Sequence, residues 1–451
     1  MAPLPIPSHA PKWGRPMCEP SALPRHLHHK LRPHLNATAW HVAFSGGLDS
    51  TVLLHLLADI PDHPPLTALH IHHGLQAAAD AWPAHCQKVC DALDVPLRVI
   101  NVQVADTASV EQAARQARYQ AFATHLSPGA ILFTGQHQDD QAETVLFRLM
   151  RGTGVRGLGG IPAQRSLGQG TLLRPLLDVP RSALLDYAQQ HGLVWIEDPS
   201  NTDTQLSRNY LRHEVLPVLA QRWPQAAASV ARAAAHLSEA GALLDELAES
   251  DLKAARSTSP FPWLQMPSLA LAPLAALSEA RQRNALQSWL APLTRLPDAQ
   301  HWASWLSLRD AGADAAPIWR LTDGEVHRAS DRVWWVSGQW SQPQPADALW
   351  SSPDRPLSLA DNGEVSWQGD ELRGEVQIRY RQGGETMRLP GRGRRDLKRL
   401  LNESGLPAFV RRRLPLLFID GELIAVANLP LSTATNGRLL WLPPTSDQSL
   451  R

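Results

Sequence analysis

Cysteine is scarce in this chain of 451 residues, which contains only Cys18, Cys86 and Cys90. An odd and small number of cysteines excludes a disulfide framework and is typical of a reducing compartment, so we expect a cytoplasmic protein. No C-x-x-C pair is present. Cys86 and Cys90 lie four residues apart on an expected helix, where they share one face and are best interpreted as small buried hydrophobic residues.

Long apolar runs are also missing. No uninterrupted apolar stretch reaches the roughly 18 residues that a membrane-spanning helix needs, and the N-terminal region lacks the apolar core of a secretory signal. Lysine plus arginine and aspartate plus glutamate number 43 each, so the overall charge indicates no class of partner. The sequence also shows no internal repeat. These absences argue against membrane-spanning, secreted disulfide-rich and repeat proteins.

The length suggests several domains, and the composition changes along the chain. Residues 1–38 contain eight prolines and five histidines, and we expect a disordered extension there. Residues 39–217 alternate between apolar runs and helical patterns. Residues 218–340 predict a mainly helical domain closed by two short strands. Residues 341–372 predict a linker, and residues 373–451 predict a small, basic α+β domain.

Residues 39–217 predict an α/β fold. The expected strands cover residues 39–44, 66–72, 97–104, 130–135 and 193–198. Helices are expected at residues 51–58, 76–93, 109–126 and 139–150. This alternation is typical of a doubly wound, mostly parallel sheet with helices on both faces, whose ligands bind beyond the carboxyl ends of the strands.

Lysine is absent from the one segment that is built like a phosphate loop. The segment SGGLDS (Ser45–Ser50) joins the first expected strand to the first helix, and its glycines let a helix N-terminus approach an anion. The hydroxyls of Ser45, Ser50 and Thr51 add donors, but the pattern G-x-x-x-x-G-K-[ST] does not occur. Asp49 repels phosphate unless a divalent cation lies between them, so the loop predicts Mg²⁺ and a pyrophosphate leaving group. The alternative is that Asp49 only caps its helix.

Further polar side chains follow the other expected strands. His72 and His73 come after the second strand, and Asp139, Asp140 and Glu143 come after the fourth. Glu143 lies four residues beyond Asp139, so the two share a helical face. Capping needs only one such acid, and the excess favours a metal-binding or basic role.

The last polar segment follows the fifth expected strand. Ser200 or Asn201 is expected to cap a helix, and Arg208, Asn209 and Arg212 then lie on one side of it. Side chains of this kind bind phosphate or carboxylate groups.

Taken together, these motifs resemble one family. SGGLDS resembles the pyrophosphate loop (PP loop) of the N-type ATP pyrophosphatases. The series HHGL, EQAARQARY, HQDDQAET, RGTGVRGLGGI, LLRPLL and DPSNTDTQLSRNYLR, in that order, resembles the tRNA(Ile)-lysidine synthases, densely over residues 39–217. RRDLKRLLNESGLPAFVRRRLPLLFIDGELIAV, with an expected hairpin turn at Asp420 and Gly421, resembles their C-terminal module. One departure is Gln136, where many members carry histidine.

The resemblance implies a two-step ligation that uses ATP, Mg²⁺ and free L-lysine. In that family the substrate is the wobble cytidine (position 34) of tRNA-Ile with a CAU anticodon. Its O2 attacks the α-phosphate of ATP and pyrophosphate leaves. The ε-amine of lysine then attacks C2 and expels AMP, which gives lysidine.

Roles for individual residues follow from the same resemblance. The implied ATP-binding residues are Ser45, Gly46, Gly47, Leu48, Asp49, Ser50, His72 and Arg115, with Arg118 as the alternative source of positive charge. The implied catalytic residues are Asp49, Asp139, Asp140, Glu143 and Arg208, with Asp49 and Asp140 as the ligands of Mg²⁺. We expect Glu143 to act as the base on the lysine amine and Arg208 to bind the lysine carboxylate. The alternative bases are His72, His73 and His137.

The helical domain at residues 218–340 and a basic C-terminal segment are the expected tRNA contacts. Between Arg373 and Arg413 there are twelve lysines and arginines but only four acids, although a solvated face is the simpler interpretation of such a run. The residues implied to bind tRNA are Arg394, Arg395, Lys398, Arg411 and Arg412. An alternative enzyme is a cytidine thiolase of the same superfamily, which needs a C-x-x-C pair that this chain lacks. A tRNA-binding protein with an inactive nucleotide site is the other alternative. The oligomeric state is left open, and a dimer is one state that the sequence allows.

Overall fold

The computed structural model describes residues 22–74, 80–104, 110–296, 301–312, 315–389, 393–431 and 436–444. The chain forms two compact units, Met1–Ala242 and Leu243–Arg451. Within the described ranges, no helix is both long enough and apolar enough to cross a membrane.

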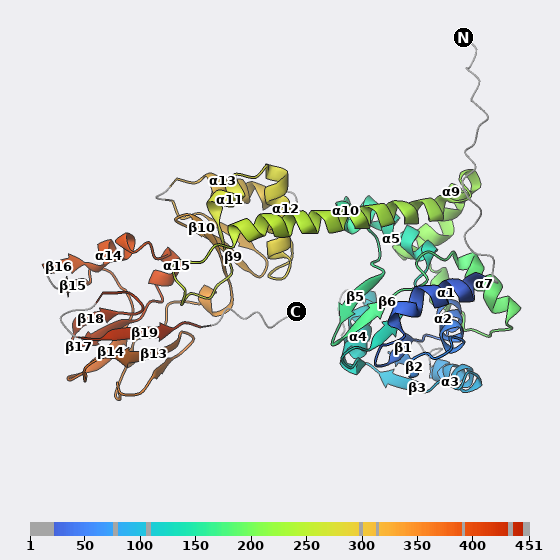
Figure 1. Cartoon of the computed structure of the whole chain (residues 1–451), viewed down its shortest axis with the longest axis horizontal. Coiled ribbons are helices and arrows are strands. Elements are labelled where there is room, and N and C mark those ends of the chain that lie inside the picture. The colour runs from blue at the N-terminus through green and yellow to red at the C-terminus, as the bar shows by residue number, and fades with distance from the viewer. Residues whose placement is uncertain are drawn as a thin grey trace, which may run out of the picture. The chain divides into compact units, whose positions relative to one another are not determined.

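A six-stranded sheet forms the centre of the first unit (Figure 1). Its strands are β1 (Trp40–Ala43), β2 (Leu66–His72), β3 (Leu97–Asn101), β4 (Ile131–Phe133), β5 (Gln164–Leu167) and β6 (Gly170–Leu173). The spatial order is β3-β2-β1-β4-β6-β5, and every pairing is parallel except that of β5 with β6. The helices are α1 (Leu23–Leu31), α2 (Leu48–Ala58), α3 (Trp82–Ala92), α4 (Val110–His125), α5 (Gln138–Met150), α6 (Val155–Leu158), α7 (Arg181–Gln190), α8 (Ser207–Tyr210) and α9 (Leu216–Arg222).

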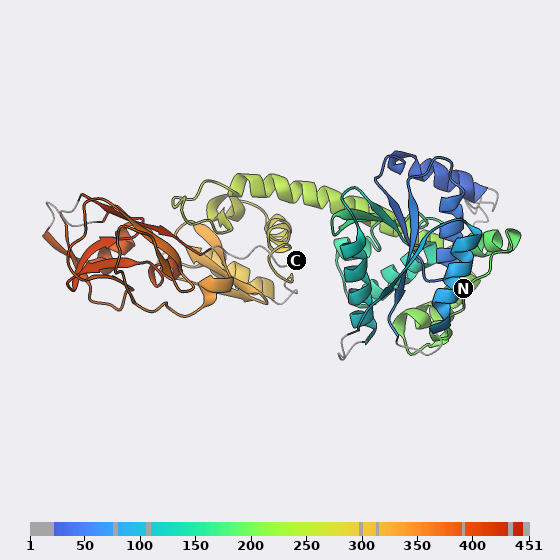
Figure 2. The same ribbon diagram turned by 90° about the horizontal axis from the view of Figure 1, so that it is seen from below.

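The two faces of this sheet are covered by different helices (Figure 2). Trp40 and Val42 of β1 belong to the core cluster that α1, α2, α3 and α7 complete. Ala43, one residue further along, packs instead against the cluster that contains Phe122 of α4 and the following Leu126. Successive side chains of a strand point to opposite faces, so the alternation places helices on both. The predicted doubly wound, mostly parallel fold is confirmed.

The strand order locates the ligand crevice. From β1 the chain proceeds to β2 and β3 in one direction, whereas β4 and β6 lie on the other side of β1. Ligands of open α/β sheets bind at the carboxyl ends of the strands where the order reverses, which here is between β1 and β4. Since α2 follows β1 and α5 follows β4, the N-termini of these two helices border the crevice.

The predicted strand at residues 193–198 is wrong. These residues have no regular secondary structure, and Ile196 donates its backbone N–H to the Gly46 carbonyl at 2.8 Å. The position beside β4 is occupied by β6, which forms a hairpin with β5, so residues 193–198 cannot pair with β4.

The predicted disorder is also wrong for residues 22–38. Leu23, Leu27 and Leu31 of α1 are fully buried in the core of the first unit, at the four-residue spacing of one helical face. Pro24 lies in the first helical turn, where proline removes no hydrogen bond of the helix. Residues 1–21, including Cys18, lie outside the described ranges.

The second unit contains mostly antiparallel sheets. Helix α10 (Ala226–Ala255) leads to a sheet of order β7-β10-β9-β8, in which two strands were not predicted. These strands are β7 (Ser268–Ala270), β8 (Ile318–Leu321), β9 (Gly324–Ala329) and β10 (Arg332–Val336), and the helices packed with them are α11 (Leu271–Ala275), α12 (Glu279–Leu290) and α13 (Trp302–Asp310). Trp305, Trp319 and Trp335 fill their common core.

The C-terminal part of the second unit begins earlier than predicted. Its elements are β11 (Ala348–Leu349), β12 (Leu357–Leu359), β13 (Gly363–Gln368), β14 (Val376–Arg379), β15 (Thr386–Leu389), β16 (Gly393–Asp396), α14 (Leu397–Glu403), α15 (Ala408–Arg411), β17 (Leu416–Ile419), β18 (Glu422–Val426) and β19 (Arg438–Leu442). Residues 341–372 are therefore not a linker, because β11 pairs with β14 and β13 pairs with β19. The predicted turn is confirmed: Asp420 and Gly421 have φ of 49° and 83° and join β17 to β18.

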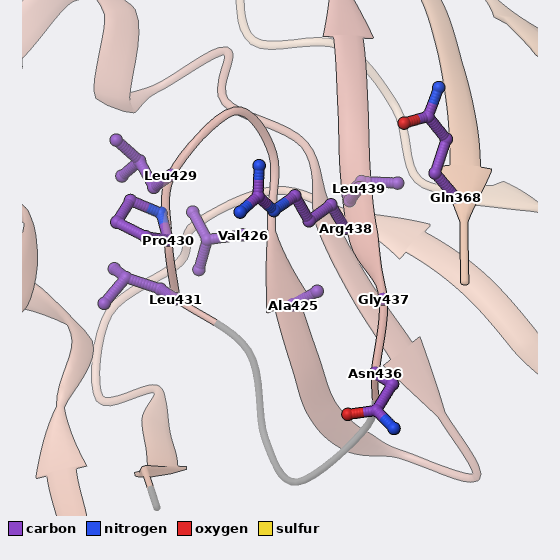
Figure 3. Close-up of a pocket in the computed structure, with 10 residues that line it drawn as sticks. All are labelled: Gln368, Ala425, Val426, Leu429, Pro430, Leu431, Asn436, Gly437, Arg438 and Leu439. Atoms are coloured by element: carbon purple, nitrogen blue, oxygen red, sulfur yellow. The ribbon is translucent and has the colours of Figure 1, made fainter. Parts of the chain in front are cut away.

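A pocket of about 560 Å³ also lies in this part (Figure 3). Its lining residues are Gln368, Ala425, Val426, Leu429, Pro430, Leu431, Asn436, Gly437, Arg438 and Leu439. None of them is a predicted site residue, and the predicted acids all belong to the first unit.

Candidate active site

The loop after β1 is held open by its own hydrogen bonds. The Ser50 hydroxyl donates to the Gly47 carbonyl at 3.0 Å, and the Ser45 and Ser50 hydroxyl oxygens lie 3.0 Å apart. Gly46 has φ of +83°, and a Cβ there would lie 2.9 Å from the Ile196 side chain. The loop therefore needs glycine at this position. The N–H groups of Ser45 and Gly47 donate to hydroxyls of the loop itself, both at 3.3 Å, so an anion would be bound by the N–H groups that follow at the start of α2.

Asp49 lies in the first turn of α2. Its Oδ2 lies 3.6 Å from Nε2 of His137, which precedes α5. Its Oδ1 is buried and has no hydrogen-bond partner. A buried carboxylate oxygen without a partner is costly, so Asp49 has an unmet need for a cation or a donor.

Close backbone contact brings the end of β4 to this loop. A Cβ at Gly135 would lie 3.0 Å from the Asp49 carbonyl oxygen. Any side chain at residue 135 would force the two segments apart. Gly135 thus allows the acids of α5 to reach the loop.

His137 lies among three aspartates and is only 1% exposed. Its ring nitrogens lie 3.5 Å from Asp140, 3.6 Å from Asp49 and 3.7 Å from Asp139. Burial lowers the pKa of His137, but the nearby Asp49 carboxylate and the charges of Asp140 and Asp139 outweigh it, so the pKa is raised above its usual value. His137 also caps α5. Its ring Nδ1 accepts from the backbone N–H of Asp140, and the carboxylate of Asp140 accepts from the backbone N–H of His137.

Glu143 is buried and bound by an arginine. Arg212 Nε donates to one Glu143 oxygen at 2.6 Å, and Nη2 donates to the other at 3.0 Å and to Asp140 Oδ1 at 3.0 Å. Burial raises the pKa of Glu143 above its usual value, against the opposing effect of Arg212. Arg212 lies in a π-helical turn, Leu211–Val215, a feature often found at functional sites.

The other predicted residues of this segment differ from one another. Arg208 is exposed, and its Nη2 lies 3.4 Å from the Thr144 hydroxyl, so it is free to meet a ligand. Asn209 is buried and donates to the carbonyls of Ser200 and Asp203, both at 2.9 Å, which gives it a structural role.

Asp198, rather than Ser200 or Asn201, caps the short helical turn that follows it. The predicted cap was therefore wrong.

His72, the last residue of β2, and His73, which follows it, are partly buried. His72 Nε2 lies 3.5 Å from an oxygen of Asp80. Burial, followed by the positive charge of Arg118, lowers the pKa of His73. A neutral imidazole suits the predicted alternative role of His73 as a base.

Sequence reasoning missed Arg174, which lies near the predicted Arg115. Arg174, at the end of β6, is 3% exposed and donates from Nε to Gln136 Oε1 at 3.0 Å. Arg115 lies over the ring of Tyr119 at 5.0 Å. The sequence did contain a signal for Arg174: in LLRPLL, this charged residue directly follows an apolar strand. Gln136, the departure from the family pattern, is thus held in place by Arg174.

Three family models match the chain. The PP-loop domain model matches residues 21–219, the TilS substrate binding domain model matches residues 269–334, and the TilS substrate C-terminal domain model matches residues 376–441. The chain is 60% identical over 442 residues to the tRNA(Ile)-lysidine synthase of Pseudomonas fluorescens, which covers 96% of this chain and 100% of that relative. The chain belongs to the tRNA(Ile)-lysidine synthase family.

Further members of the tRNA(Ile)-lysidine synthase family match over most of their length as well. The chain is 62% identical over 424 residues to the Pseudomonas putida synthase, covering 93% of this chain and 99% of that one. It is 42% identical over 400 residues to the Escherichia coli O157:H7 synthase, covering 86% of this chain and 91% of that one. The family expected from the motifs, and with it an ATP-dependent PP-loop ligase, is confirmed.

Within this lysidine synthase fold, the basic residues of the C-terminal part fall into two groups. Arg394, Arg395, Lys398 and Arg412 are exposed. Arg411 is half-buried, and it donates from Nε to the Leu406 carbonyl at 2.6 Å and from Nη1 to Asn402. The Arg411 guanidinium is therefore turned toward its own domain, whereas the four exposed side chains can meet a partner.

The described cysteines do not suit the thiolase alternative to lysidine synthesis. Cys86 and Cys90 are fully buried, and burial raises their pKa to about 12 and about 11. Such thiols stay protonated and unreactive. Both pack in the core of the first unit, as predicted.

Proposed function

We propose that this chain joins the ε-amine of free L-lysine to C2 of the wobble cytidine in tRNA-Ile with a CAU anticodon, with ATP converted to AMP and pyrophosphate. The observation that carries the proposal is the similarity to lysidine synthases over nearly the whole chain, including both TilS modules. The crevice at β1 and β4 supports it, because an acid stands in the phosphate loop there.

In the first step, the loop Ser45–Ser50 and the N-terminus of α2 bind the β- and γ-phosphates of ATP. The partial positive charge of the helix and the free backbone N–H groups favour these anions and the pyrophosphate that leaves. His72 and Arg115 lie on β2 and α4 and bind the rest of the nucleotide. The cytosine O2 can then attack the α-phosphate in line with the leaving group.

Asp49 and Asp140 are the proposed ligands of Mg²⁺. The buried, unpaired Oδ1 of Asp49 fits a cation, and the carboxylate of Asp140 meets the same His137 nitrogen as that of Asp49. Two carboxylates do not complete the coordination of Mg²⁺, so phosphate oxygens and water would supply its other ligands. When bound, the cation offsets negative charge on the leaving pyrophosphate.

In the second step, lysine must lose a proton before its amine can attack C2. The amine has a pKa near 10.4, so only about one molecule in a thousand is uncharged at neutral pH. Glu143 is the proposed base, and burial makes it a better proton acceptor by raising its pKa. Asp139 lies at the mouth of the same helix as a partner for the ammonium. Arg208, exposed at the crevice, binds the lysine carboxylate with paired hydrogen bonds.

The tRNA is held mainly through its phosphates. The modified base must be turned out of its stack, which an anticodon loop permits at low cost. Arg394, Arg395, Lys398 and Arg412 are the proposed phosphate contacts. Arg411 was predicted to bind tRNA as well. We propose instead that it stabilises its own domain, because it donates hydrogen bonds to Leu406 and Asn402.

The proposal is tested by following labelled lysine. The chain is incubated with ATP, Mg²⁺, labelled lysine and a tRNA-Ile transcript carrying CAU, and the tRNA is digested to nucleosides. Label at the wobble nucleoside, dependent on ATP, is expected. A tRNA-Met with the same anticodon is the control. Transfer of label to neither tRNA, or pyrophosphate release that needs no tRNA, would contradict the proposal.

A further inference from the structure

The guanidinium groups of two arginines, Arg115 and Arg165, lie against the ring of Tyr119 in α4. The proposed reaction gives these two arginines no common role. The Arg115 guanidinium is 5.0 Å from the centre of the Tyr119 ring, and the Arg165 guanidinium is 4.8 Å from it. Arg115 comes from α4 and Arg165 from β5, so two elements bring positive charge to one ring. The ring faces attract both cations and fix where they lie.

A third arginine lies near the same tyrosine. Arg174 is 3% exposed, and Tyr119 is close enough to raise its pKa. Its Nε donates to Gln136 Oε1 at 3.0 Å and its Nη1 to the Pro162 carbonyl at 2.7 Å. Both acceptors are neutral, so neither of these hydrogen bonds compensates the charge of Arg174.

No carboxylate balances this cluster. In the described part of the chain, Arg115, Arg165 and Arg174 form no ion pair with an acid, in contrast to Arg212 with Glu143. Burial lowers the pKa of Arg174, and the charges of Arg165 and Arg115 lower it further, against an opposing effect of Tyr119. Three like charges held together without a counter-charge are unfavourable, and an anion bound among them relieves the repulsion.

The cluster adjoins the candidate active site. Gln136, which accepts from Arg174, directly precedes His137, and His137 pairs with Asp49. Gln136 also accepts from the Thr134 hydroxyl at 2.5 Å. The cluster therefore lies beside the ends of β4 and β6, at the same edge of the sheet as the PP loop.

We propose that Arg115 and Arg165, fixed by Tyr119, form a second phosphate-binding site, and that Arg174 is the residue that positions Tyr119. Both Arg115 and Arg165 are exposed, and guanidinium groups bind phosphate oxygens with paired hydrogen bonds. The inference rests on the proposed function, which supplies two phosphate-bearing substrates, ATP and tRNA. A phosphate group of ATP or of tRNA can bind between these arginines.

Equilibrium binding separates the two sources. One arm measures the tRNA-Ile transcript without ATP over a range of salt, and the other measures ATP with Mg²⁺ without tRNA. Arg165→Ala is expected to weaken one of these probes by roughly tenfold. If the phosphate belongs to tRNA, the salt dependence of log K also flattens by about 0.7 to 0.9. The matched control is Arg98→Ala, which removes an exposed arginine from β3 at the opposite edge of the sheet.

Tyr119→Phe tests the positioning role of Arg174. It keeps the ring next to the two arginines but removes the hydroxyl through which Tyr119 interacts with Arg174. We expect the same probe to bind about threefold more weakly, with an unchanged melting temperature and with the other probe unaffected. A purely structural role would lower the melting temperature and leave both affinities alone.

The inference is overturned if Arg165→Ala binds both probes as tightly as Arg98→Ala does. Failure of the proposed function gives a different result. If the unaltered chain transfers no lysine but Arg165→Ala still loses affinity for one probe, the phosphate site stands and only the assigned reaction is wrong.

Discussion

The charged side chains of the candidate active site are buried and paired, whereas the basic side chains proposed to bind tRNA are exposed. In the first unit, His137 is 1% exposed among three aspartates, and Arg212 donates to both oxygens of Glu143. In the second unit the basic residues proposed to bind tRNA, such as Arg394 and Lys398, are exposed. Chemistry at phosphorus benefits from charges fixed in a dry crevice, whereas a polyanion is held by charges that reach its phosphates through water.

This contrast separates the effects that mutations should have. A change in the paired network should alter the rate of a chemical step at saturating substrate. A change among the exposed arginines should alter affinity and its dependence on salt, because counterion release dominates such binding.

The largest effect is expected for Asp49→Asn. The amide keeps the shape of the side chain but loses the charge that a cation needs, so adenylation should slow on the order of a thousandfold while the fold stays intact. The measurement is pyrophosphate release with saturating tRNA and Mg²⁺. Asp59→Asn, an exposed acid at the other end of α2, is the matched control and should be nearly silent. Near-normal release by Asp49→Asn at saturating Mg²⁺ would rule out the metal role.

The next largest effect is expected for Glu143→Gln. We expect the adenylated tRNA to form, but lysine transfer to slow by about a hundredfold with a raised KM for lysine, because the amide cannot take the proton. A single-turnover reaction with labelled ATP and tRNA, followed by a lysine chase, separates the two steps.

Arg212→Lys is the companion variant for Glu143, since it keeps the charge but not the paired hydrogen bonds. If both variants slow the two steps equally, Glu143 serves to place Arg212 at the ATP site. If Glu143→Gln slows neither step, the base must be sought at His72, His73 or His137.

A smaller effect is expected for the exposed arginines. Replacing Arg394, Arg395 and Lys398 with alanine should weaken tRNA binding and lower the salt slope by about 0.7 to 0.9 for each phosphate that is no longer neutralised. Arg411→Ala is the internal comparison: its donors hold Leu406 and Asn402, so it should lower stability more than the salt slope. An unchanged slope in the triple variant would mean that these side chains do not touch tRNA.

The smallest effect on catalysis is expected for Leu27→Ala in α1. The side chain is fully buried, so its loss should destabilise the first unit by about 2–5 kcal/mol, measured by thermal or denaturant unfolding. Turnover well below the unfolding transition should stay near normal, because no proposed site residue lies on α1. Equal stability of the variant would mean that α1 does not pack as described.

Local motifs explain what the sequence predicted well. Ser45–Ser50 and Asp139–Glu143 are short segments whose residue types carry their chemistry, and the strands before them follow simple apolar patterns. Strand β2 was predicted with its observed limits, Leu66–His72. The convergence of Asp49 with the acids of α5 also followed, because parallel strands present their carboxyl ends at one edge.

Long-range pairings explain what was missed. Arg212 binds Glu143 across 69 residues from within a π-helical turn that no local pattern marks. Strands β11 and β13 pair with strands that come later in the chain, so the proline- and serine-rich sequence of residues 341–372 suggested a linker. The many prolines of residues 1–38 suggested disorder and concealed the three leucines of α1 at helical spacing.

The most direct test compares the two units in one assay. Pyrophosphate release in a single turnover is measured over a range of tRNA concentrations for Asp49→Asn and for the triple variant of Arg394, Arg395 and Lys398. The triple variant should reach the rate of the unaltered chain once tRNA saturates, whereas Asp49→Asn should stay on the order of a thousandfold slower at every concentration. The division of labour would be contradicted if the triple variant stayed slow at saturation, or if more tRNA restored Asp49→Asn.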